Sequence, residues 1–425
     1  MSGFKQPYHD PGLTKNRARY LRLLRVLQAR GLLGFKRNVK ETVGLFAVWK
    51  KNGEQRLILD GRGPNLRWAD SPPARLATGQ SFAAIVAEGE QPLEIGGVDI
   101  AVAFYAMGLP AELQEYFGLP AVRCGELDVT AINGVACSAG ELVHPVFTAI
   151  PMGWSQALYI CQEVLESIAG RVPEVREDNC LRDRKPAPSP SPFLHTEYAD
   201  NFVMVGTQRG SALRLSQAVK TELEAAGLPT HEAEGAVGGT TLGWDFSALR
   251  PEVGASRRGV WRMRLAIDAI LQRGRIRGSS LSRLVGHYSF RALMRREMLS
   301  VLHAVYGFAH ANWDNDAALW PAVARELRWC RGLAHLSWRN LGATWCSEVS
   351  VFDASSYGMG VVTKKVPEPM VRETCKFSDR WRFRRRGEAK AGRPREFLET
   401  GADGSPFSAP EDSEVPGDFH PRSAG

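Results

Sequence analysis

Hydrophobic positions recur along the chain with two different periods, and the changes of period predict where strands and helices lie. Residues 16–33 carry leucines on one face and arginines elsewhere, which predicts an amphipathic helix ending near Gly31. Residues 43–60 alternate apolar and polar positions on both sides of an Asn52-Gly53 pair. Because an Asn-Gly pair between two alternating runs is typical of a β-hairpin, we expect one here.

The rest of the chain alternates short apolar runs with helical segments. In chain order the pattern predicts a strand over 95–103, the start of a helix over 110–117, a loop and helix over 151–169, a strand over 197–206, a helix near 211–226, a strand over 236–246, Arg-rich helices over 261–310 and a strand pair over 348–363. Residues 171–196 are rich in proline, serine and charge, which indicates a loop or insertion. Beyond about residue 375 the composition predicts disorder.

This order of elements predicts an α+β fold, a mixed core with helical pieces at both flanks. The length of 425 residues favours two to three domains. Hydrophobic residues make up 44% and charged residues 24%, close to the average of globular proteins. No run of 18 apolar residues occurs, so we expect neither a transmembrane helix nor a membrane partner.

The positive charge is concentrated in three segments. The net charge is +8, yet residues 1–40 hold ten basic residues against one acidic, and residues 251–310 hold eleven arginines against three acidic residues. Residues 371–395 are also strongly basic, whereas the last thirty residues are acidic. Separate basic segments are typical of a polyanion partner, and nucleic acid is our first interpretation. The alternative is that the arginines only maintain solubility.

The cysteines and histidines show no pattern of a metal site. There is no C-x-x-C pair and no H-x-x-x-H pair, so we do not expect a site built on these residues. Reduced thiols favour a cytoplasmic or nuclear location. The seven cysteines are Cys124, Cys137, Cys161, Cys180, Cys330, Cys346 and Cys375.

Two aspartates are the strongest candidates for chemistry. Asp99 lies within a predicted apolar strand, and Asp200 lies in what reads as a hairpin turn between two hydrophobic strands. Two carboxylates brought together repel each other unless a cation lies between them, and Mg²⁺ takes oxygen ligands and substrate phosphates. Each aspartate by itself is more often a cap or turn residue; the order of the motifs around them favours a joint role.

Five segments in order resemble the reverse transcriptases of retroelements, most closely those of retrotransposons. The segments are Lys50 to Asn65, similar to the fingers hairpin; Val98 to Tyr105, similar to the first palm motif; Ile150 to Ala157, similar to the glycine motif; Tyr198 to Asn201, similar to the Tyr-x-Asp-Asp hairpin; and Leu242 to Asp245, similar to the primer-grip strand. The resemblance implies a right-hand polymerase fold of fingers, palm and thumb with an antiparallel palm sheet.

The resemblance also implies a role for each matching residue. Asp99 and Asp200 match the aspartates that bind Mg²⁺ or Mn²⁺, and Phe104 matches the side chain that closes against the sugar 2′ position. The other matches are Lys50, Lys51 and Arg56 for the triphosphate, Met152 and Gly153 for the incoming nucleotide, and Leu242, Gly243 and Trp244 for the primer grip. Local alternatives remain: Lys50 to Gly53 is also a common soluble turn, and Phe104 is also a common core residue.

Two departures from the family pattern matter. Asn201 stands where the family has its second hairpin aspartate, so a neutral amide replaces a charge in the catalytic set. Ser350 to Val362 resembles the first strand and turn of a ribonuclease H domain, with Asp353 as its first carboxylate. Only 72 residues follow Asp353, fewer than a domain of about 100–150 residues needs, so we expect a truncated, inactive remnant.

The resemblance implies a division into a basic helical segment 1–40, fingers and palm 41–250, a helical thumb or connection 251–345, a partial ribonuclease H segment 346–375 and a tail 376–425. It implies an RNA-directed DNA polymerase that uses an RNA or DNA template with a primer and deoxynucleoside triphosphates. The main alternative is a nucleic-acid-binding remnant without turnover. A third is an unrelated basic protein with coincidental motifs.

Overall fold

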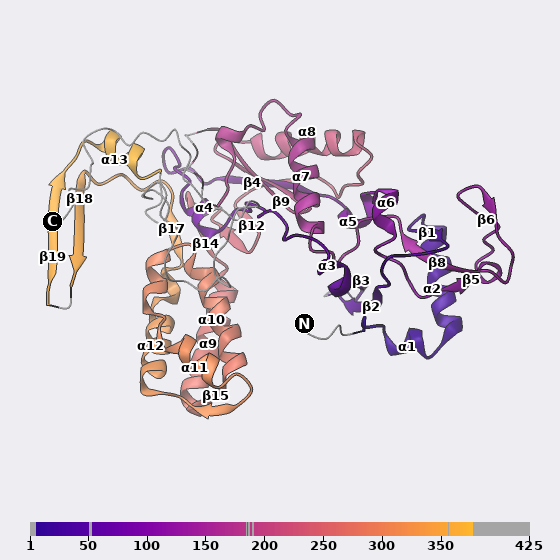
Figure 1. Ribbon diagram of the computed structural model, residues 1–425. Helices are drawn as coiled ribbons and strands as arrows, with labels where there is room; N and C mark the ends of the chain where they lie inside the picture. The colour runs from indigo at the N-terminus through magenta and orange to yellow at the C-terminus, as the bar shows by residue number, and fades with distance from the viewer. Residues whose placement is uncertain are drawn as a thin grey trace, which may run out of the picture.

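The computed structural model describes residues 6–50, 53–183, 185, 188, 191–355 and 357–376. Its centre is a four-stranded antiparallel sheet in the order β11 (Glu234–Val237), β4 (Glu94–Asp99), β10 (Asn201–Gly206), β9 (Phe193–Tyr198). Helices α7 (Ala157–Ala169) and α8 (Ser211–Ala225) pack on this sheet (Figure 1). Four consecutive apolar residues of β10 are buried, as expected for a central strand covered on both faces.

The N-terminal part of the chain joins the same core and does not form a separate unit. It contains α1 (Pro11–Thr14), α2 (Arg17–Ala29), the sheet β1 (Leu33–Lys36), β8 (Leu142–Phe147) and β5 (Val122–Arg123), and the hairpin β2 (Gly44–Trp49) and β3 (Gln55–Asp60). Tyr20, Leu24 and Leu27 of α2 are buried in the core that also holds the central sheet. The boundary expected at residue 40 therefore does not separate two cores.

The second half of the described chain has two further cores. One lies between α4 (Gly79–Ala83) and the sheet β12 (Gly239–Thr241), β13 (Trp244–Phe246), β14 (Glu252–Ala255), β17 (Trp338–Asn340). The other lies inside a bundle of α9 (Arg257–Arg273), α10 (Gly278–Ala292), α11 (Ala304–Ala311) and α12 (Pro321–Leu333), which extends away from the central sheet (Figure 1). The small ladder β15 (Arg275–Arg277) with β16 (Asp316–Ala318) closes one end of the bundle.

The remaining elements are short. They are α3 (Arg62–Asn65), α5 (Ala103–Ala106), α6 (Ala111–Gln114), β6 (Ala131–Ile132), β7 (Val135–Ala136), the 3₁₀ turns at 124–126, 177–179, 296–301 and 334–336, the hairpin β18 (Glu348–Ala354) and β19 (Met359–Lys365), and α13 (Glu368–Thr374). None of the helices within the described ranges is long and apolar enough to cross a membrane.

The hairpin over 43–60, the helices at 16–33, 151–169 and 211–226, and the strand pair at 348–363 are confirmed. Three predicted strands are wrong in their bounds. The strand expected over 95–103 ends at Asp99, because Val102 has a left-handed φ of 51° and a helical turn follows. Residues 197–206 and 236–246 each contain a chain reversal, so each range holds parts of two or more strands. The tail over 377–425, where we predicted disorder, lies outside the described residues.

Candidate active site

The two candidate aspartates come together because of the register of neighbouring strands. Asp99 is the last residue of β4, and its antiparallel partner is Asn201, the first residue of β10. Asp200 lies in the turn that joins β9 to β10, where Ala199 has a left-handed φ of 58°. The Ile100 amide donates to the Asp200 carbonyl oxygen at 2.9 Å. Asp99 and Asp200 therefore share one end of the central sheet.

The surroundings of Asp99 disfavour its negative charge. Burial and, second, the charge of Asp200 raise the pKa of Asp99, while His231 opposes the shift. The Asp99 side chain is 42% exposed, yet its Oδ1 atom is shielded from solvent and has no hydrogen-bond partner among the described residues. His231 Nε2 lies 3.9 Å from the other carboxylate oxygen. Burial and these two carboxylates together raise the pKa of the Cys161 thiol beneath them to about 12.

Asn201 interacts directly with Asp200. Its amide nitrogen donates to Asp200 Oδ1 at 2.9 Å. Asn201, which stands where the family has a second aspartate, therefore orients the Asp200 carboxylate. This site therefore combines the shielded Asp99 oxygen with the Asp200 carboxylate and the Asn201 amide. Such a set of oxygen donors fits a divalent cation. Asp99 and Asp200 could hold Mg²⁺ or Mn²⁺, and the Asn201 amide adds no charge to the set.

Helix α5, which follows Asp99, contacts the hairpin β2–β3. The Tyr105 hydroxyl donates to the Leu57 carbonyl oxygen at 2.7 Å, and burial raises the Tyr105 pKa to about 12 against the opposing charge of Arg56. Arg56 is exposed on β3, and Phe104 lies on α5, half-buried against the main core. Phe104 is thus helical and lies beyond the end of β4, because the backbone turns at Val102.

The loop with Met152 and Gly153 is bound tightly to β3. The Leu59 amide donates to the Met152 carbonyl oxygen at 3.0 Å. Gly153 has φ 124°, and a Cβ atom there would lie 2.1 Å from the Leu59 carbonyl oxygen. Only glycine fits such a conformation at such a distance, so Gly153 lets the backbone of this loop approach β3 closely. These contacts connect the hairpin, the loop and the Asp99 motif.

Lys50, another predicted residue of the nucleotide group, lies near the tip of the hairpin. The Lys50 ammonium is 3.0 Å from Glu54 Oε2 on the same hairpin, so part of its charge is balanced locally. Lys51 lies outside the described residues.

The predicted primer-grip residues form the turn between β12 and β13. Leu242 and Gly243 both have positive φ, of 47° and 84°. Trp244 is 1% exposed and stacks on Phe290 with ring centroids 4.7 Å apart. Trp244 therefore supports the turn from the second core, and Leu242 and Gly243 are the members closer to the surface.

Asp353 lies far along the chain on an isolated hairpin. Strands β18 and β19 pair with each other over seven residues, and no other described strand pairs with either. Val351, Phe352, Val361 and Val362 are each more than 60% exposed. The strand pair is present as expected, but Asp353 belongs to no group of three or more potential metal ligands within the described ranges.

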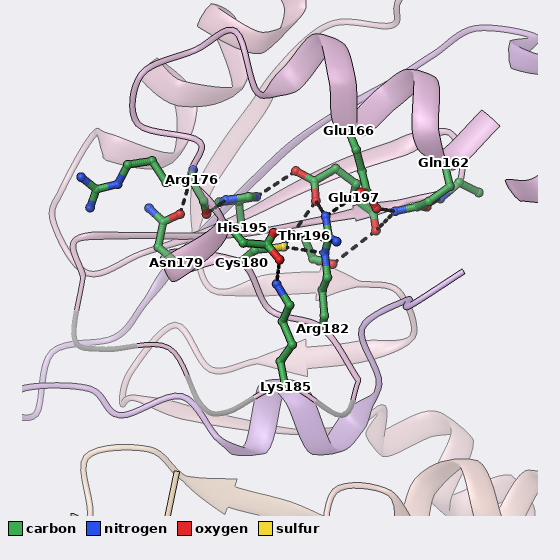
Figure 2. A network of polar contacts seen from close by, with 12 residues as sticks. Gln162, Glu166, Arg176, Asn179, Cys180, Arg182, Lys185, His195, Thr196 and Glu197 are labelled. Atoms are coloured by element: carbon green, nitrogen blue, oxygen red, sulfur yellow. Dashed lines mark hydrogen bonds and ion pairs between the residues drawn. The ribbon is translucent and has the colours of Figure 1, made fainter. Parts of the chain in front are cut away.

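The structure also forms a polar cluster that sequence reasoning missed. Cys180, His195 and Glu197 are all buried, and their ligand atoms lie within 4.8 Å of one another (Figure 2). Sequence spacing did not identify these three residues as a group. The cysteine comes from the segment predicted as a loop or insertion, 15 positions before the histidine. The one local signal was His-x-Glu, which places both side chains on one face of a strand.

The first helix of the bundle presents basic and aromatic side chains to solvent. Arg257, Arg258 and Arg262 on α9 are exposed, and Arg264 lies over the ring of the exposed Trp261 at 5.9 Å. No carboxylate pairs with these guanidinium groups among the ion pairs of the described residues. Free arginines beside an exposed aromatic ring are typical of surfaces that contact phosphates and bases.

No protein-family model matches the sequence, and no curated protein does. Among solved structures, a foamy viral protease–reverse transcriptase in complex with double-stranded DNA aligns over 85% of this chain and 55% of its own, with a TM-score of 0.53 and 14% sequence identity. Another structure of the foamy viral protein with double-stranded DNA aligns over 86% and 67%, with a TM-score of 0.51 and 13% identity. This chain thus spans about half to two thirds of the viral chains. At this identity the likeness establishes the fold, which is similar to that of viral reverse transcriptases.

Proposed function

We propose that this chain is an RNA-directed DNA polymerase of a retroelement, and that it adds deoxynucleotides to a primer 3′ end. The observation that carries the proposal is the meeting of Asp99 and Asp200 at one end of the central sheet, in a fold similar to that of reverse transcriptases. In this proposal residues 41–250 are fingers and palm and residues 251–345 the thumb. The hairpin at 346–375 is a remnant of a ribonuclease H domain.

In the proposed reaction Asp99 and Asp200 hold Mg²⁺ or Mn²⁺. When bound, such ions stabilise the negative charge on the oxygens of an in-line phosphoryl transfer. The other contribution of the protein to phosphoryl transfer is to position the substrates. Arg56 provides a planar guanidinium that suits the triphosphate, and Tyr105 holds α5 against β3 so that Phe104 faces the sugar. Met152 and Gly153 let the backbone approach the incoming nucleotide.

Primer extension on poly(rA)·oligo(dT) with Mg²⁺ or Mn²⁺ tests this function. We expect extension by the natural chain and a loss of at least about 10³-fold in Asp99→Ala and Asp200→Ala, because each removes a charged ligand. The matched control is Asp314→Ala, an exposed aspartate in the bundle, which should extend normally. Extension that persists at full rate in Asp200→Ala would refute the proposal.

A second candidate is a nucleic-acid-binding remnant without turnover, and Asn201 favours it because the amide contributes no charge toward a cation. Asn201→Asp separates the two functions. If the natural chain does not extend primers and Asn201→Asp does, the chain is a decayed polymerase. If neither variant extends primers while duplex binding is intact, the remnant is the better description.

Both candidates require that α9 contacts the primer–template duplex. Replacing Arg258 and Arg262 by Gln should weaken duplex binding and lower the slope of log affinity against log salt by about 2, because each phosphate contact releases about one counterion. The control is the same change at Arg209 and Arg214, two exposed arginines beside and within α8, outside the basic segments. Equal changes of slope in the two pairs would mean that the bundle has no special role in binding.

A further inference from the structure

The buried cluster of Cys180, His195 and Glu197 contains the donor atoms of a zinc site. We propose that it binds one Zn²⁺ ion, which fastens the segment before β9 to the central sheet. The inference does not depend on polymerase activity, since the cluster shares no residue with the candidate catalytic set.

Strand geometry brings the three side chains together. His195 and Glu197 are two positions apart on β9, so both project from the same face. Cys180 forms a parallel bridge with His195, and the Leu181 amide donates to the His195 carbonyl oxygen at 2.7 Å. Because of this bridge, the Cys180 thiol lies beside β9 although the rest of its segment is irregular.

The distances and burial fit a metal site. His195 Nδ1 lies 2.9 Å from Glu197 Oε1, and Cys180 Sγ lies 3.5 Å from Glu197 Oε2. The three residues are 2%, 2% and 3% exposed. Thiolate, imidazole and carboxylate are the usual protein ligands of Zn²⁺, and three of them leave one position of a tetrahedral site for water.

Neighbouring groups make hydrogen bonds that hold the proposed metal ligands in place. His195 Nε2 lies 2.9 Å from the Arg176 carbonyl oxygen, which leaves Nδ1 directed at the cluster. A metal-bound histidine usually donates its other ring N–H to such a carbonyl, which fixes the ring. The Gln162 amide donates to the Glu197 carbonyl oxygen at 3.0 Å and so holds the strand from α7 (Figure 2).

Charges around the cluster balance when a divalent cation is added. Zn²⁺, the Cys180 thiolate and the Glu197 carboxylate sum to zero. The neighbouring cation Arg182 lies 2.7 Å from Glu166 of α7 and 3.6 Å from Glu197, and it donates to Cys180 Sγ at 3.1 Å. A buried site without excess charge avoids a large desolvation cost.

Zinc content measured on the purified full chain tests the proposal. The background variant C137S/C346S/C375S removes the thiols that are exposed or half-buried. We expect one Zn²⁺ per chain with an apparent Kd below about 1 µM, set against a competing chelator. Cys180→Ser and His195→Ala should lose the ion, whereas Cys330→Ser, a buried cysteine in the bundle, should retain it. Three results would overturn the proposal: less than half a zinc ion per chain, a weaker Kd, or retention of zinc by Cys180→Ser.

A second measurement covers the case in which Cys180→Ser does not fold. Co²⁺ added to the metal-free background protein should give a thiolate-to-cobalt charge-transfer band and the visible bands of tetrahedral cobalt. A spectrum of octahedral Co²⁺ without the charge-transfer band would show that the cluster is a metal-free hydrogen-bond network, and would also overturn the proposal.

Discussion

At the residue scale, the backbone takes strained conformations beside the predicted motifs. Val102, Ala199 and Leu242 have left-handed φ angles between 47° and 58°, although none is glycine. Val102 lies within the first palm motif, Ala199 precedes Asp200, and Leu242 precedes Gly243. Such conformations cost about 1–3 kcal/mol each and persist where the surrounding structure imposes them, commonly at functional sites. Their positions agree with the candidate active site.

Gly153→Ala is expected to destabilise the chain by about 3 kcal/mol or more, because its Cβ would overlap the Leu59 carbonyl oxygen of β3. The matched control is Gly89→Ala, which has φ 83° and no atom within 4 Å of the new Cβ. The control should lose only about 1 kcal/mol, the cost of the left-handed conformation. Urea unfolding measures both, and equal losses would mean that the contact with β3 does not matter.

Asp60 should make stability depend on pH in the acid range. Its hydrogen bond with Arg62 and those from backbone amides lower its pKa from 3.8 to about 2. A carboxyl with a lowered pKa stabilises the fold above the unfolded value of 3.8, and this contribution disappears as the pH falls toward 2.

Asp60→Asn should therefore lose about 1–2 kcal/mol at pH 7 and progressively less as the pH falls below 4. Urea unfolding at pH 7, 4 and 3 measures this difference, with Asp314→Asn as the exposed control. A loss of the same size at pH 3 and pH 7 would contradict the expected role of the carboxylate.

At the element scale, carboxylates from other elements cap two helices. Glu326 of α12 is 6% exposed and accepts hydrogen bonds from the His303, Ala304 and Val305 amides at the start of α11. Glu94 of β4 accepts from the Gly210 and Ala212 amides at the start of α8. A negative charge there satisfies free amides and favours the helix dipole.

Glu326→Gln should cost about 2 kcal/mol, because the amide has one acceptor oxygen and no charge for three buried N–H groups. Glu297→Gln, on an exposed side chain of the same bundle, should change stability by less than about 0.5 kcal/mol. Thermal unfolding followed at 222 nm would report both, and an unchanged Glu326→Gln midpoint would rule out this cap.

At the scale of the whole molecule, three hydrophobic cores hold the chain from α2 to β17. None of these cores includes a residue of β18 or β19. A two-stranded hairpin without further packing is only marginally stable. The hairpin therefore contributes little to the stability of the rest of the chain.

A chain ending at residue 344 should unfold within about 2 °C of the full chain by calorimetry. Under the proposed function it should also extend primers at a similar rate, since the hairpin provides none of the candidate catalytic groups. A large fall in the unfolding temperature would show that the C-terminal segment packs on the cores.

Much of the fold and the site followed from local patterns. The 43–60 hairpin follows from alternation around Asn52-Gly53, and the helix at 16–33 follows from leucines at helical spacing. The likeness to reverse transcriptases followed from the order of five short motifs, which needs no tertiary information. Solved structures similar to this chain agree with that interpretation at the level of the fold.

The sequence by itself predicted most of the helices and strands and singled out Asp99 and Asp200 as candidates, because periodicity, turn residues and motif order are properties of neighbouring positions. Only the tertiary structure decided where β4 ends, that Trp244 is buried, and that Cys180 meets His195. The end of β4 depends on the backbone at Val102, and burial depends on what packs against a side chain. The meeting of Cys180 with His195 depends on a bridge between segments 15 residues apart. Such long-range contacts are set by register and packing, which local patterns do not contain.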